Sequence, residues 1–216
     1  MNDYIGQNIK VVLFDHDDTL VGTIGPKWDE HKFIAQTYYD KHLTDAEIRE
    51  HWGKPLNELV CLLYGTDDAE QAIVYNVTHH EQYPKKLFSH TIPVLTSLHK
   101  QGKKIGVITA TNRFSFDYDL DSLQIPRELF DFTQTADETS YHKPNPKVFD
   151  PMLIWLKDNN IRADEVIYIG DGLHDMKAAI GAGFQFLGVE TGLVNKKQFE
   201  EVQAISVPTA GHLIRL

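Results

Sequence analysis

Three aspartates fall within four positions, directly after an apolar run with the composition of a buried strand. Asp15, Asp17 and Asp18 follow Val11-Val12-Leu13-Phe14, and Thr19 comes next. Carboxylates this close repel one another and lose solvation, so a cation or a proton is needed to offset the cost. The segment is either an acidic loop or helix cap, or a site with a nucleophilic carboxylate, a carboxyl for proton transfer and a divalent metal.

A second acidic segment follows the apolar run Val166-Ile167-Tyr168-Ile169. There Gly170-Asp171-Gly172 leads into a helical pattern that carries Asp175. Ligands of open α/β sheets collect at the carboxyl ends of strands, where the strand order reverses. If the two strands are neighbours, Asp171 faces Asp15, and this cluster of hard oxygen ligands suits Mg²⁺. The alternative is that both acidic residues merely cap and decorate the following helix.

Groups suited to binding an anion lie between these two acidic segments. Thr109 ends the apolar run 104–109, where its hydroxyl and backbone N–H groups such as that of Ala110 can hold an anion at a helix start. Lys143 lies on a stiff turn, His142-Lys143-Pro144-Asn145-Pro146. Each has a plainer alternative, a helix cap for Thr109 and a surface lysine for Lys143. The interpretation as an anion-binding site depends on the complete set, the two acidic segments with Thr109 and Lys143 between them, in this order along the chain.

Short β-branched runs separated by helical patterns must position these residues. We expect strands at 9–14, 104–109, 131–134, 166–169 and 184–189, and crossover helices at 145–159 and 173–180. This pattern is typical of a parallel sheet covered by helices on both faces, and predicts an α/β fold with a Rossmann-like core. Asn145 can cap the first crossover helix, with Pro146 in its first turn.

An insertion separates the first two strands, which lie about ninety residues apart, far more than one crossover helix requires. Helical patterns cover 26–42, 44–52, 55–64 and 67–83, and we find no strand pattern among them. We therefore expect a Rossmann-like core made of residues 1–21 and 89–216, with an all-helical cap domain at 22–88.

The composition limits the classes of partner. The chain has 216 residues and a formal net charge of −10, from 21 Lys and Arg against 31 Asp and Glu. An acidic surface repels nucleic acids and anionic membranes, so we expect neither as a partner. Cys61 is the single cysteine, which favours a reducing compartment. Without a signal-peptide pattern or a bilayer-spanning run, we expect a cytoplasmic protein. The oligomeric state stays open.

The ordered set resembles the four motifs of the haloacid dehalogenase superfamily of hydrolases. Its spacing is similar to that of the phosphoglycolate phosphatase-like branch, which carries a helical C1-type cap. In the insertion, residues 52–59 look like the cap segment of that branch, and residues 178–183 look like its turn after the fourth motif. The motifs are Asp15-x-Asp17-x-Thr19, then Thr109, then Lys143, then Gly170-Asp171 with Asp175.

The resemblance implies catalytic roles for the matched residues. Asp15 would be the nucleophile that forms an aspartyl-phosphate. Asp17 would protonate the leaving oxygen and then activate the hydrolytic water. Thr109, Ala110 and Lys143 would bind the phosphoryl oxygens. These roles agree with the chemistry of the residues themselves, because covalent catalysis by a carboxylate divides the displacement into two steps.

The resemblance also implies Mg²⁺ as the cofactor. Asp15, the backbone carbonyl of Asp17 and the carboxylate of Asp171 would be its ligands, with Thr19 and Asp175 in supporting positions around them. The bound cation and the nearby lysine would offset charge on the equatorial oxygens of the phosphoryl group.

Two positions within the motifs depart from the pattern of the branch, and Ser89-His90 replaces its Pro-Gly where the chain re-enters the core. Asp18 stands where glycine is usual, and either caps the local structure or raises the proton affinity of Asp17. Gly172 stands where serine or threonine is usual in this branch, and in this glycine the chain is similar to the phosphoserine phosphatase-like branch instead. Both bear on the subgroup and the substrate rather than on the chemistry.

The leading hypothesis is a Mg²⁺-dependent phosphatase that hydrolyses a small phosphorylated metabolite, a phosphate ester, through an aspartyl-phosphate. One alternative is a β-phosphoglucomutase-like sugar phosphomutase, which shares the fold and the cap type. Another is a catalytically silent binding module on the same fold, which would need none of the charged motif residues. Which substrate is bound depends on the cap, and the sequence does not identify it.

Overall fold

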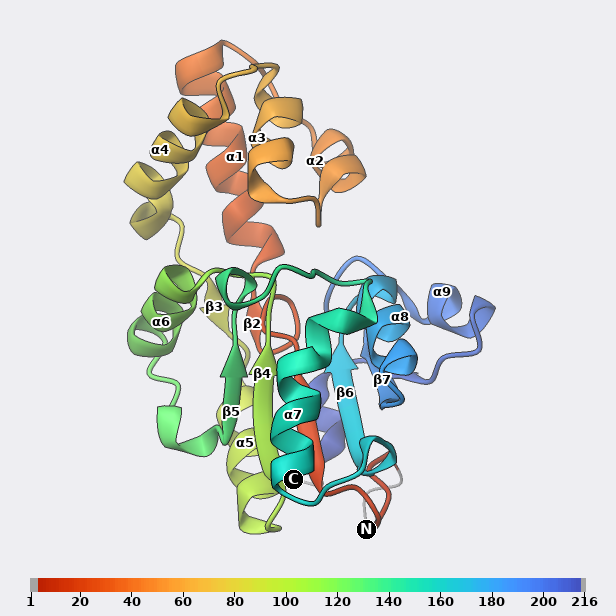
Figure 1. Ribbon diagram of the computed structural model, residues 1–216. Coiled ribbons are helices and arrows are strands. Elements are labelled where there is room, and N and C mark those ends of the chain that lie inside the picture. The colour runs from red at the N-terminus through yellow and green to blue at the C-terminus, as the bar shows by residue number, and fades with distance from the viewer. Residues whose placement is uncertain (1–3, 215–216) are drawn as a thin grey trace. The chain divides into compact units, whose positions relative to one another are not determined.

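The structure, a computed structural model, describes residues 4–214 (Figure 1). The chain divides into two compact units. The first, called the core unit, comprises the residues up to Gly22 and from Leu87 onward; the second, called the helical unit, is Thr23–Lys86. Both acidic strand ends found in the sequence belong to the core unit.

A six-stranded parallel sheet lies at the centre of the core unit, in the order β5-β4-β1-β6-β7-β8. Val11 of β1 is in register with Lys104 of β4 on one side and Val166 of β6 on the other. The expected Rossmann-like sheet is confirmed, as is the adjacency of the two strands with acidic ends. The strands are β1 (Val11–Phe14), β4 (Lys104–Ile108), β5 (Phe132–Gln134), β6 (Val166–Gly170), β7 (Gln185–Val189) and β8 (Ser206–Val207).

Helices cover both faces of this sheet because alternate side chains of each strand point to opposite faces. Val12 and Phe14 of β1 belong to one apolar cluster with α5 (Thr91–Lys100) and α6 (Arg113–Ser122). Val11 and Leu13 belong to a second cluster with α7 (Asp150–Asp158) and α8 (Leu173–Gly181). Figure 1 shows α7 in front of the strands. Burial on both faces explains why β1 is a continuous apolar run.

The predicted helix over 145–159 is wrong at its start. A 3₁₀ turn, η4 (Pro146–Phe149), comes first, and α7 begins only at Asp150. Pro151 has no N–H to donate to the carbonyl of Lys147, so an α-helical ladder cannot run through this point. Asn145 caps the turn as expected, since its side-chain oxygen accepts a hydrogen bond from the Lys147 N–H at 3.0 Å. The helix predicted at 173–180 is confirmed by α8.

Among residues 4–214, no helix combines the length and the apolar character that a membrane span requires.

Several short elements complete the core unit. The remaining core elements are α9 (Lys196–Glu201) and the 3₁₀ turns η2 (Arg127–Leu129), η3 (Ala136–Glu138), η5 (Ala163–Glu165) and η6 (Ala210–Leu213).

The helical unit contains the four helices that the sequence predicts, each within a few residues of its expected bounds. The second helix begins at a capping box, in which the Thr44 N–H donates to Glu47 at 2.8 Å and the Glu47 N–H donates to the Thr44 hydroxyl. The helices are α1 (Ile24–Tyr39), α2 (Asp45–His51), α3 (Leu56–Tyr64) and α4 (Ala69–His79), followed by the turn η1 (His80–Gln82).

The expectation of an insertion without strands over 22–88 is wrong at its two ends. The two-residue strands β2 (Val21–Gly22) and β3 (Lys86–Leu87) form a separate two-stranded sheet. Strands this short carry no readable alternation, and their pairing depends on residues far apart in the sequence.

A buried polar network lies inside the helical unit. His31 Nδ1 lies 2.7 Å from the Tyr64 hydroxyl, and the Asn76 amide donates to the same hydroxyl at 3.1 Å. Burial lowers the pKa of His31 to about 4, and the positive charge of Lys27 acts in the same direction. The native protein therefore holds His31 as the neutral imidazole.

We expect the free energy of unfolding to fall as the pH drops from about 6.5 towards 4. In that window the unfolded chain binds a proton at His31 and the folded chain does not, so stability is full above the window and is lost below it. The loss attributable to His31 amounts to about 3 kcal/mol. Urea unfolding followed by circular dichroism at several pH values measures it. His31→Gln keeps a partner for Tyr64 and should flatten this part of the pH profile; an unchanged profile would contradict the assignment.

Candidate active site

Four of the predicted site residues meet at the carboxyl ends of the central strands. Lys143 Nζ lies 2.8 Å from Asp15 Oδ1 and 2.7 Å from Asp175 Oδ1. Carboxylate oxygens of Asp15, Asp171 and Asp175 all lie within 4.8 Å of one another. The sheet thus assembles one charged cluster from three segments that are distant in the sequence.

Lys143 is the buried cation of this cluster, with 4% of its side chain exposed. Besides the two carboxylates, it donates to the Tyr168 hydroxyl at 3.1 Å, and that hydroxyl donates to the Ile108 carbonyl at 2.7 Å. Burial alone would lower the pKa of Lys143, but the charges of Asp15 and Asp175 outweigh it and hold the pKa well above its usual value. Lys143 is therefore positively charged at neutral pH.

Asp175 is fixed at both of its carboxylate oxygens. Lys143 binds Oδ1, and the Gly172 N–H at the start of α8 donates to Oδ2 at 2.9 Å. A side chain at position 170 would not fit here, because a Cβ on Gly170 would lie 2.7 Å from the Asp175 carboxylate. Burial raises the pKa of Asp175, but Lys143 opposes this and the net pKa lies below its ordinary value. Asp175 is thus an anion that orients Lys143.

The cluster has more negative than positive charge. Burial, followed by the charges of Asp175, Asp15 and Asp18, raises the pKa of Asp171 well above its usual range. Burial likewise raises the pKa of Asp15, against the opposing charge of Lys143. Carboxylates that resist ionisation in this way need a further cation. The donor set is made of hard oxygens, as Mg²⁺ prefers, so the residues present fit that ion.

The loop after β1 owes its shape to Asp18. This residue has φ of 53°, in the left-handed region, and its N–H donates to the Val21 carbonyl at 2.7 Å. Glycine adopts this conformation at low cost, and aspartate does so more readily than most other residues. The departure from glycine at this position therefore keeps the turn. The same residue adds a buried negative charge that acts on Asp171.

The remaining predicted residues lie on this loop and after β4. Thr109 is buried, its N–H donates to the Gln134 carbonyl at 3.0 Å, and its hydroxyl accepts from the Thr111 N–H at 3.0 Å. Ala110 is exposed. Thr19 is buried, and within the described residues its hydroxyl has no hydrogen-bond partner.

The structure adds polar residues that sequence reasoning did not single out. The Thr111 hydroxyl donates a short hydrogen bond to Asp17 Oδ2, and Tyr168 binds Lys143 as described. His16 Nε2 lies 3.0 Å from Asp119 Oδ2 of α6, which anchors the residue between the two motif aspartates. A hydroxyl two positions beyond Thr109 is a usable signal for Thr111. Tyr168 gives none, since it reads as one more residue of an apolar strand.

The chain resembles known proteins over most of its length. A family model described as haloacid dehalogenase-like hydrolase matches residues 12–189. The pyrophosphatase PpaX of Anoxybacillus flavithermus is 25% identical over 185 residues, with 84% of each chain covered. The glyceraldehyde 3-phosphate phosphatase of Methanocaldococcus jannaschii is 27% identical over 216 residues, with 90% of this chain and 89% of the relative covered.

A solved structure is similar over nearly the whole chain. The crystal structure of a Bacteroides fragilis protein assigned to the haloacid dehalogenase-like hydrolases superposes with a TM-score of 0.78 at 29% identity. The superposition covers 95% of this chain and 100% of that one.

Proposed function

The chain belongs to the haloacid dehalogenase-like hydrolase family and is a phosphoric ester hydrolase, and from this premise we propose that it is a Mg²⁺-dependent phosphatase of a small phosphorylated metabolite. Family membership confirms the resemblance seen in the four motifs. The observation that carries the proposal is Lys143 bound between Asp15 and Asp175, beside Asp171. A cation and an excess of carboxylates at the carboxyl ends of neighbouring strands suit phosphoryl transfer.

In the first step, a carboxylate oxygen of Asp15 attacks phosphorus while the bond from phosphorus to the leaving oxygen breaks. The product is an aspartyl-phosphate and the free alcohol or phosphate. Lys143, 2.8 Å from the attacking carboxylate, stabilises the negative charge on the transferring group. The hydroxyl of Thr109 and the backbone N–H of Ala110 bind the other phosphoryl oxygens.

Asp17 transfers protons in both steps. It gives a proton to the leaving oxygen in the first step, which prevents the build-up of charge there. In the second step it removes a proton from the water that attacks the aspartyl-phosphate, and Asp15 leaves as the carboxylate. The same carboxyl is thus the acid and then the base.

The acidic cluster is the proposed metal site. Asp15, Asp171 and the backbone carbonyl of Asp17 would hold Mg²⁺, which supplies positive charge to the phosphoryl oxygens when it is bound. Asp175 contributes by holding Lys143 in place, and Thr19 lies buried in the same loop.

We propose that the helical unit, residues 23–86, acts as a cap that selects the substrate. Two relatives bear the names of a pyrophosphatase and of a glyceraldehyde 3-phosphate phosphatase, so family membership alone does not determine the substrate. A cap that closes over the site discriminates by contacts made only in the closed state.

Phosphate release from a panel of phosphorylated metabolites and inorganic pyrophosphate, with and without Mg²⁺, tests the proposed function. We expect one group of small phosphate esters to be hydrolysed and release to need the metal. Failure of every substrate, including a small activated aryl phosphate, would refute a phosphatase. A variant in which a short linker replaces residues 23–86, if folded by circular dichroism, should keep the aryl phosphatase activity and lose the ranking of metabolites. An unchanged ranking would refute the cap assignment.

A further inference from the structure

The proposed acid and base, Asp17, is held by a side chain from another strand end. The Thr111 hydroxyl, two residues beyond Thr109, donates a short hydrogen bond to Asp17 Oδ2. Both side chains are half-buried. The bond joins the loop after β1 to the loop after β4, the neighbouring strand. A carboxyl bound at one oxygen cannot rotate freely about its last torsion, so its other oxygen keeps a constant position.

Thr111 is itself fixed by its backbone. Its N–H donates to the Thr109 hydroxyl at 3.0 Å, and its carbonyl accepts from the Ala136 N–H at 3.0 Å. Ala136 begins η3, directly after β5. The loops after three adjacent strands, β1, β4 and β5, are therefore joined through this one threonine.

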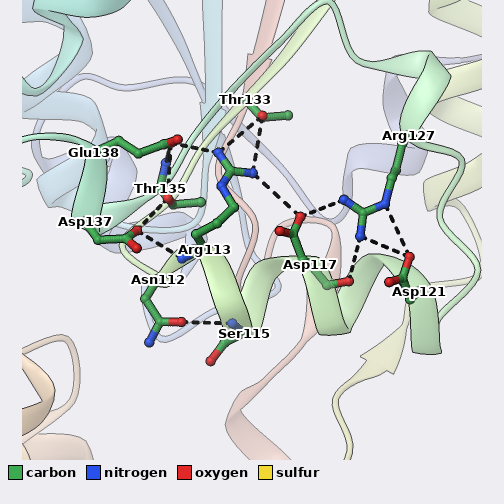
Figure 2. Close-up of polar contacts among 10 residues, drawn as sticks. All are labelled: Asn112, Arg113, Ser115, Asp117, Asp121, Arg127, Thr133, Thr135, Asp137 and Glu138. Carbon is green, nitrogen blue, oxygen red and sulfur yellow. Dashed lines mark hydrogen bonds and ion pairs between the residues drawn. The ribbon is translucent and has the colours of Figure 1, made fainter.

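The start of α6 provides a second attachment to the same turn (Figure 2). The Arg113 N–H donates to Asp137 at 3.0 Å, and the Arg113 guanidinium donates to Glu138 at 2.7 Å. Asn112 caps the helix by accepting from the Ser115 N–H at 2.8 Å. Asn112 and Arg113, which follow Thr111, are thus held by hydrogen bonds, so the Thr111 hydroxyl lies on a rigid segment.

We propose that Thr111 is a positioning residue for proton transfer by Asp17, an inference that rests on the proposed function. The Thr111 hydroxyl orients the Asp17 carboxyl so that its second oxygen, Oδ1, meets the leaving oxygen of the substrate. In the first step the proton passes from Asp17 to the leaving oxygen as the phosphorus–oxygen bond breaks. Thr111 keeps its own proton and its hydrogen bond to Oδ2 throughout.

The basicity of the leaving group separates this role from a merely structural one. A weakly basic leaving group such as 4-nitrophenolate departs without a proton, whereas a strongly basic one requires the acid. A misplaced Asp17 therefore slows the reaction of basic leaving groups selectively. Loss of fold or of phosphate binding slows all of them alike.

The test is kcat/KM for a series of substituted phenyl phosphates, since kcat/KM covers only the steps up to departure of the leaving group. Thr111→Val removes the hydroxyl at nearly equal volume. We expect a loss of about threefold with 4-nitrophenyl phosphate and of roughly 30-fold or more with the most basic phenolate. Thr111→Ser restores the hydroxyl and should return the series to within about threefold of the wild type. Thr96→Val, the same change at a half-buried threonine of α5, is the matched control, and any loss of kcat/KM that it causes should be equal for all leaving groups.

An equal loss across the series in Thr111→Val would overturn the inference, as would Thr111→Ser behaving like Thr111→Val. If Thr111→Val does not fold, Thr111→Ala and the serine variant give the same comparison. Asp17→Asn, measured on the same series, separates the two levels of the proposal. If the loss of kcat/KM rises steeply with leaving-group basicity in Asp17→Asn but not in Thr111→Val, only the role of Thr111 is refuted. If the loss in Asp17→Asn is equal for all leaving groups, the acid role of Asp17 itself is refuted.

Discussion

Asp15→Asn is expected to lower kcat by about 10⁵-fold or more, to the detection limit of a phosphate-release assay. Asparagine keeps the size of the side chain and its acceptor oxygen but not the attacking charge. Lys143 keeps its contact with Asp175 at 2.7 Å, so we expect the variant to fold. Phosphate release from an activated aryl phosphate measures the loss, with circular dichroism as the check on folding.

The exposed Asp158 at the end of α7 offers the matched control. Asp158→Asn makes the same chemical change on the core surface and should leave kcat within about twofold of the wild type. Mass spectrometry of the Asp15→Asn protein excludes conversion of the new asparagine back to aspartate. Activity above a few per cent of the wild type in the intact variant would remove Asp15 from the nucleophile's role.

Removal of divalent metal with EDTA is expected to abolish turnover, and Mg²⁺ is expected to restore it. The reason is the charge of the cluster, in which the carboxylates of Asp15, Asp171 and Asp175 lie close together and Lys143 binds two of them, Asp15 and Asp175. Asp171→Asn removes one proposed ligand, and a loss of roughly 10²-fold or more in activity at the same Mg²⁺ concentration is expected. Activity that persists after exhaustive chelation would contradict the metal site.

Thermal unfolding gives a second reading of the same site that does not depend on activity. Without metal, Asp171→Asn should be more stable than the wild type, because it removes a half-buried carboxyl whose pKa is raised by desolvation and by the neighbouring carboxylates. With Mg²⁺ the order should reverse, since only the wild type gains the free energy of binding. An identical Mg²⁺-induced shift in both proteins would show that Asp171 is not a ligand.

The charged part of the site could be read from the sequence because its residues follow apolar runs. The strands predicted at 9–14 and 166–169 are β1 and β6, and their adjacency brings Asp15 and Asp171 to one edge. Contacts between residues that are far apart in the sequence could not be predicted from it. Nothing in the sequence pairs Thr111 with Asp17, 94 positions earlier, or Tyr168 with Lys143.

The helix α6 shows a different limit. Phe114, Phe116, Tyr118 and Leu120 alternate with polar residues, which is the period of a strand. The segment is a helix instead, which begins at the Asn112 cap and buries Phe116 and Leu120, four positions apart. Phe114 points away from this buried side and is 71% exposed. Local capping and tertiary burial override the alternation here. The two-residue strands β2, β3 and β8 carry too little pattern to be predicted at all.

Covalent transfer to Asp15 is tested most directly in Asp17→Asn with 4-nitrophenyl phosphate. This leaving group needs no acid, so the first step proceeds, while the second step lacks its base and the aspartyl-phosphate accumulates. A burst of about one 4-nitrophenolate per protein chain is predicted, with one phosphoryl group on the peptide containing Asp15 by mass spectrometry. Continued release of 4-nitrophenolate from a protein without that group, or with the group on another residue, would contradict the proposed mechanism.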